Sequence, residues 1–110
     1  MENEVKLGSE TLTLLYKSLM PYHYRITSVL EDIIKEKYTI GEIEKAVLLE
    51  HASCTTALKS IFESMLEEVE ESGAKYLKVK REEYLNILSM TKSVEVATRM
   101  SFGNFGLWAH

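Results

Sequence analysis

Apolar residues recur at three- and four-residue spacing along most of this chain, which is the spacing of one face of an α-helix. The longest such pattern covers residues 40–72 and, unbroken, would form a helix about 50 Å long at about 1.5 Å per residue. With five Gly and one Pro, the chain has too few turn residues for a sandwich of short strands. We therefore predict an all-α fold, a bundle of about four helices with one long central helix.

Two helices are predicted in the first third of the chain, one on either side of the single proline. Residues 9–20 carry one apolar stripe, whose start Ser9 or Thr11 could cap. Pro21 is expected to end this helix or to begin the next, because its ring cannot continue the hydrogen-bond ladder of a preceding helix. Residues 22–37 carry a second amphipathic pattern and are the strongest helix prediction in the chain.

The long central helix has a predicted start and a predicted end. The Thr-x-x-Glu spacing from Thr39 to Glu42 is that of a capping box, and Gly73 is a typical helix terminator. Residues 51–56 are its weak point, because Ser and Thr side chains there compete for backbone hydrogen bonds, so the helix is either split or continuous. A last helix is expected over residues 81–101.

Residues 76–79, with the sequence Tyr-Leu-Lys-Val, alternate loosely in side-chain character and could form a short strand. One strand cannot satisfy its own backbone hydrogen bonds. We therefore expect this segment either to pair with another chain or to remain a loop.

Charge is divided unevenly along the sequence. Residues 1–73 carry 7 Lys/Arg and 14 Asp/Glu, whereas residues 74–110 carry 6 and 3, within a net charge of −4. Such asymmetry can orient copies of the chain head to tail, can mark a basic patch for a polyanion, or can be chance unevenness of a solvated surface. The acidic start and the lack of a long apolar run favour a soluble, cytoplasmic protein without a membrane partner.

The residues capable of catalysis or metal binding are few and scattered. His51 and Cys54, three apart on a predicted helix, supply half a metal site, and His23 and His110 lie on other segments. A free Cys in an apolar helix is usually an inert small side chain, and a single Cys forms no intramolecular disulfide. The motifs of di-iron bundles, serine hydrolases, phosphate-binding loops and zinc proteases do not occur. We predict no enzyme activity, no metal and no cofactor.

One short segment combines positive charge with an aromatic ring. Its members are Lys75, Tyr76, Lys78, Lys80 and Arg81. Phosphate contact and base stacking require these residue types together, so the segment is a candidate nucleic-acid site. Short basic runs are also common on any protein surface.

The last nine residues contain two of the three Phe and the only Trp of the chain. Leaving Phe102, Phe105, Leu107 and Trp108 in water forgoes about 1.5–3 kcal/mol for each large side chain that could be buried. We predict a helical domain over residues 1–101 and an aromatic docking tail over residues 102–110. The tail either folds back on its own helices or inserts into a neighbouring subunit or a different protein.

These features favour a non-enzymatic helical module for protein–protein interaction, a small adaptor, inhibitor or assembly subunit that acts as a homo-oligomer. In this hypothesis the tail anchors the partner, the helix faces supply contact area and the charges select orientation. The alternative is a small nucleic-acid-associated regulator that uses the basic segment 75–81.

Overall fold

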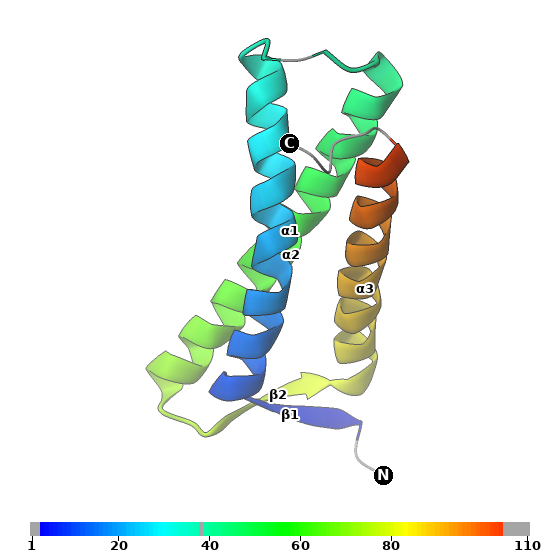
Figure 1. The fold of residues 1–110 in the computed structure, drawn as a ribbon. Helices are drawn as coiled ribbons and strands as arrows, with labels where there is room; N and C mark the ends of the chain where they lie inside the picture. Colours follow the sequence, from blue (N-terminus) through cyan, green and yellow to red (C-terminus); the bar gives the residue numbers. More distant parts are fainter. Residues whose placement is uncertain (1–2, 38, 105–110) are drawn as a thin grey trace.

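The computed structural model describes residues 3–37 and 39–104, and side chains as far as Met100. In this part of the chain, three helices and one two-stranded sheet follow one another along the sequence (Figure 1). The elements are β1 (Glu4–Gly8), α1 (Ser9–Ile34), α2 (Glu42–Ser72), β2 (Tyr76–Lys80) and α3 (Arg81–Asn104). The predicted, mainly helical fold is confirmed, but these residues form three helices where about four were expected.

Helix α1 runs through Pro21 without a break, so the prediction of two helices meeting at this proline is wrong. The buried residues of α1 lie on both sides of it, with Leu12 and Leu19 before and Ile26 and Val29 after. Proline removes one backbone hydrogen bond from a helix, but its ring here lies at an exposed position. Burial of the continuous apolar stripe against α2 outweighs that loss, because packing supplies most of the stability of a helix in a protein.

Helix α2 is continuous over 31 residues, with no break at residues 51–56. It ends as predicted at Gly73, whose φ of 67° lies in the left-handed region that favours glycine. The predicted capping box is wrong, because Gly41 rather than Thr39 is the N-cap residue and no side chain caps it by a hydrogen bond. The carboxylate of Glu44 instead folds back over Gly41, where any side chain would displace it.

The predicted strand exists, but its partner lies in the same chain. Strand β2 pairs antiparallel with β1, with Val79 opposite Val5 and Leu77 opposite Leu7. The expectation that this segment would pair with another chain or stay a loop is therefore wrong. Residues 4–8 alternate between charged and apolar side chains, which is the signal that would have identified β1.

The core consists of three clusters along the length of the molecule. Ile26, Val29, Leu30 and Leu48 join α1 to α2 at the end distant from the sheet. Leu19, Leu58, Phe62, Ile87 and Val94 join all three helices in the middle. Leu7, Leu12, Val69 and Val79 join the helices to the sheet, which lies where α1 and α3 begin (Figure 1).

This arrangement is elongated, with dimensions of 50 × 27 × 19 Å. Its radius of gyration of 16.3 Å exceeds the value of about 13 Å expected for a compact chain of this length. Within the described residues, none of the three helices has the apolar run that a membrane-crossing helix requires. One side of α3, which carries Leu85, Val96 and Met100, is exposed along the length of the helix.

Candidate functional site

Helix α3 carries apolar or small side chains on two opposite sides. One side faces the core through Ile87, Val94 and Thr98, which are all buried. At 100° per residue, a second set falls on the opposite side of the helix. We call this set the outer face, and its members are Leu85, Ser89, Ser93, Val96, Ala97 and Met100.

The outer face exposes large apolar side chains in one stripe. Leu85 is 52% exposed, Val96 45% and Met100 60%. Scattered single apolar residues are normal on a protein surface, but several aligned on one side of a helix indicate a surface that binds a partner. Met90, 42% exposed, lies at the edge of the same stripe.

Small side chains hollow out the middle of the outer face. Ser89, Ser93 and Ala97 follow one another at four-residue spacing and line a shallow pocket of about 520 Å³, together with Lys92, Val96 and Met100. A ridge of another helix can enter such a groove, because small residues let two helix backbones approach closely. The charged side chains beside it, Lys92 and Glu95, pair with each other at 3.6 Å along one edge.

The predicted aromatic tail lies almost wholly outside the described residues. Phe102 falls within the last turn of α3, which continues to Asn104 and therefore crosses the boundary predicted after residue 101. Phe105, Leu107 and Trp108 follow beyond it. The tail and its docking role stay predictions.

The second candidate surface is the solvent side of the sheet. Strand alternation places Tyr76, Lys78 and Lys80 on one side of β2, all exposed, while Leu77 and Val79 face the helices. Lys75 and Arg81 flank the strand and are also exposed. The structure therefore brings the five residues of the predicted basic segment together at one end of the molecule.

Strand β1 adds one cation that the sequence analysis missed. Lys6 is exposed and lies directly opposite Lys78 in the register of the two strands. Lys6 is at least 69 residues from the basic segment in sequence. Its place beside Lys78 could be predicted only if residues 4–8 were recognised as the strand that pairs with β2. We call Lys6, Lys75, Tyr76, Lys78, Lys80 and Arg81 together the sheet face.

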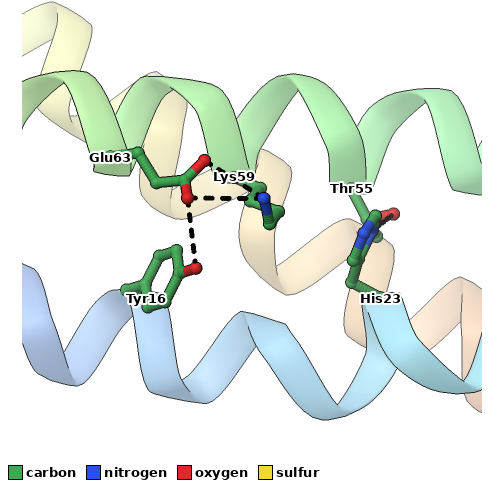
Figure 2. Close-up of polar contacts among 5 residues, drawn as sticks. All are labelled: Tyr16, His23, Thr55, Lys59 and Glu63. Carbon is green, nitrogen blue, oxygen red and sulfur yellow. Dashed lines mark hydrogen bonds and ion pairs between the residues drawn. The ribbon is translucent and has the colours of Figure 1, made fainter.

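Between α1 and α2 lies a row of polar contacts (Figure 2). The Tyr16 hydroxyl donates to Glu63 Oε2 at 3.3 Å, and Lys59 Nζ donates to both Glu63 oxygens at 3.2 and 3.3 Å. Partial burial and the negative charge of Glu63 raise the pKa of Tyr16, while the positive charge of Lys59 opposes this shift. The Tyr16–Glu63 hydrogen bond joins α1 to α2, whereas the Lys59–Glu63 pair lies within α2.

A second polar contact between α1 and α2 involves His23. His23 Nδ1 lies 2.9 Å from Thr55 Oγ1, and the Thr55 hydroxyl donates to the Ala52 carbonyl at 3.1 Å (Figure 2). Because that hydroxyl has one hydrogen, His23 must donate from Nδ1 to Thr55. Burial lowers the pKa of His23, and Lys59 lowers it further while Glu63 opposes the shift. His23 is thus held in a structural contact, and half-buried Cys54 packs against the central core cluster.

The metal-capable residues are also dispersed. In the part of the chain that the structure describes, no three His, Cys, Asp or Glu side chains gather closely enough to hold a metal ion. His51 is half-buried on α2, where burial lowers its pKa and Glu50 opposes the shift. His110 lies outside the described residues.

Comparison with protein-family models, curated proteins and solved structures finds no match to this chain. Function must therefore be inferred from its own residues. Exposed apolar side chains gather on the outer face of α3, and exposed cations gather on the sheet face.

Proposed function

We propose that this chain is a non-enzymatic module for protein–protein interaction that acts as a homo-oligomer through the outer face of α3. The observation that carries the proposal is the exposed stripe of Leu85, Val96 and Met100 on the side of α3 opposite its core side. Covering a large apolar side chain contributes about 1.5–3 kcal/mol, so this stripe favours association over exposure to water.

The outer face is complementary to a copy of itself. If two α3 helices pack antiparallel about a two-fold axis at Ser93, Ser89 lies opposite Ala97 of the second copy, and Met90 lies opposite Val96. The small residues then face each other at the closest approach, while Leu85 lies level with Ser101 and Met100 with Asn86, so each of these large side chains faces a residue that leaves room for it. An isologous dimer interface requires this kind of self-matching surface.

The predicted tail extends the same surface. It begins where the outer face ends, and the six residues after Asn104 can reach up to about 20 Å when extended. Phe102, Phe105, Leu107 and Trp108 would anchor the second copy or another protein, as aromatic side chains commonly do at interfaces. An adaptor, inhibitor or assembly subunit would use the tail in this way.

The test is the mass of the protein in solution, measured by light scattering behind a sizing column. The variant Val96→Glu with Met100→Glu places two charges on the outer face without touching the core. Ile43→Glu is the matched control, because Ile43 is 79% exposed on α2 and lies outside the outer face. A form that ends at residue 104 separates the contribution of the tail.

We expect the wild type and Ile43→Glu to form a defined oligomer and the double variant to be a folded monomer. A smaller or weaker oligomer on truncation would assign the tail to the same interface. A monomeric wild type, or an oligomer that survives both charges on the outer face, would refute the proposal.

A further inference from the structure

The sheet face concentrates positive charge in a molecule whose net charge is −4. Its five cations, Lys6, Lys75, Lys78, Lys80 and Arg81, are all exposed, and none forms an ion pair with another described residue. Of the eight Lys and Arg residues outside the sheet face, five are paired with a carboxylate: Lys35, Lys37, Lys59, Lys92 and Arg99. Glu4, opposite Lys80, is the one acidic side chain that strand alternation places on the same side of the sheet.

Two of these cations lie opposite each other on the paired strands, where their like charges repel. Lys6 and Lys78 are direct cross-strand partners, and like charges in that position destabilise a strand pair. A phosphate group placed between the two ammonium groups would convert repulsion into two attractive contacts. The arrangement therefore favours an anionic ligand over an empty surface.

An aromatic ring lies next to the lysines. Tyr76 is 53% exposed, and its Cδ1 and Cε1 atoms lie 3.5 and 3.6 Å from the position that a Cβ atom at Gly8 would take. The ring of Tyr76 therefore lies beside Gly8, its partner in the register, on the solvent side of β1. A ring supported on the sheet beside lysines offers a stacking platform for a nucleobase.

A pocket at the end of the sheet adds room for a second base. It has a volume of about 660 Å³ and is lined by Asn3, Glu4, Lys80, Arg81, Glu82 and Leu85. The Asn3 and Arg81 side chains supply hydrogen-bond groups of the kind that read base edges. Unstacked bases are available in single strands and not in duplexes.

We propose that the sheet face binds single-stranded nucleic acid, with Lys6, Lys78 and Lys80 contacting phosphates and Tyr76 stacking on a base. The sheet face shares no residue with the outer face of α3, which meets the adjoining pocket only at Leu85, and binding by the sheet face does not depend on self-association. A duplex offers no base to Tyr76, and an anionic membrane offers charge without a ring to stack on it, so both should bind more weakly than a single strand.

The test measures the fluorescence anisotropy of a labelled uridine oligomer as protein is added, at increasing salt. The variant Lys6→Thr with Lys78→Thr removes the opposed pair and places β-favouring residues in the strands, so the sheet should stay folded. Lys35→Thr with Lys37→Thr is the control, because it removes the same charge at the opposite end of the molecule. Tyr76→Ala tests stacking alone.

We expect the wild type to bind and the affinity to fall as salt rises. Each phosphate contact contributes about −0.7 to the logarithmic salt slope for single strands, so loss of Lys6 and Lys78 should make the slope shallower by about 1.4. Loss of Tyr76 should weaken binding about tenfold, in the range of one stacked base, and leave the slope unchanged. The control should bind like the wild type.

Several results would overturn the proposal. These are no binding at low salt, equal weakening by the sheet variant and the control, and a Tyr76→Ala variant that binds like the wild type. Equal affinity for duplex DNA, or for vesicles that contain phosphatidylserine, would also contradict it. Because Val96→Glu with Met100→Glu leaves the sheet face intact, binding by that variant separates this site from the proposed dimer.

Discussion

Thr55 and Thr98 are both fully buried, but only Thr55 has a hydrogen-bond partner among the described residues. The Thr55 hydroxyl accepts from His23 and donates to Ala52, so it links α1 to α2. The Thr98 hydroxyl lies in the core side of α3 and has none. A buried polar group without a partner costs about 1–3 kcal/mol, so these two threonines should respond to substitution in opposite ways.

We expect Thr98→Val to raise the free energy of unfolding by about 1–2 kcal/mol, because valine keeps the shape and removes the unpaired hydroxyl. Thr55→Val should lower it by about 1 kcal/mol, since it breaks two hydrogen bonds. Urea denaturation followed by circular dichroism measures both. A destabilised Thr98→Val protein would show that this hydroxyl is bonded.

Burial lowers the pKa of His23 in the folded protein below the usual histidine value of about 6.5. The folded state therefore favours the neutral ring, and its contribution to stability is present above that value and is lost as the pH falls through the lowered pKa. We expect the melting temperature to decrease from about pH 7 to about pH 5, and to decrease less in His23→Gln. An equal decrease in both proteins would rule out His23 as a source.

Helix α1 illustrates what a pattern of residues can and cannot predict about an element. Its apolar stripe predicted helix on both sides of Pro21, and the local chemistry of proline predicted a boundary between them. Packing against α2 decided the outcome, and packing depends on residues more than 20 positions away. The free-energy cost of Pro21 inside the helix should be measurable by substitution.

We expect Pro21→Ala to raise the free energy of unfolding by about 1–3 kcal/mol, because alanine restores the missing backbone donor in a helix interior. Pro21 is exposed, so its loss leaves no cavity. Thermal and urea denaturation followed by circular dichroism test this. Unchanged or reduced stability would mean that the proline stiffens the unfolded chain by as much as it disturbs the helix.

Strands and helix ends also show what local residue patterns can and cannot predict. Local residue chemistry determines the end of α2 at Gly73 and the start of α3 at Arg81, and the alternation of residues 76–79 indicates β2. Residues 4–8 alternate in the same way, but each of these short segments forms a strand only by pairing with the other, so β1 and Lys6 could be predicted only by considering the two segments together. The outer face of α3 was also not predicted. Its apolar residues are interspersed along the sequence with those of the core side, so together they resemble the pattern of one buried helix.

At the scale of the whole molecule, the two proposed surfaces are compatible. The sheet lies where α3 begins, so an antiparallel pair of α3 helices would place the two sheet faces at opposite ends of the pair. A helix of 24 residues is about 36 Å long, so the two sheet faces would be separated by a distance of about this length. A dimer of this kind would contact one nucleic-acid strand at two places and bind it more tightly than a monomer.

The most direct measurement of the central claim is disulfide trapping across the proposed two-fold axis. Ser93→Cys in a Cys54→Ser background places one thiol at the centre of the outer face, and Ser28→Cys in the same background places one at an exposed position on α1. Under mild oxidation we expect Ser93→Cys to form a covalent dimer rapidly and Ser28→Cys to remain largely monomeric. Equal cross-linking of the two proteins, or none at position 93, would contradict an interface formed by the outer face of α3.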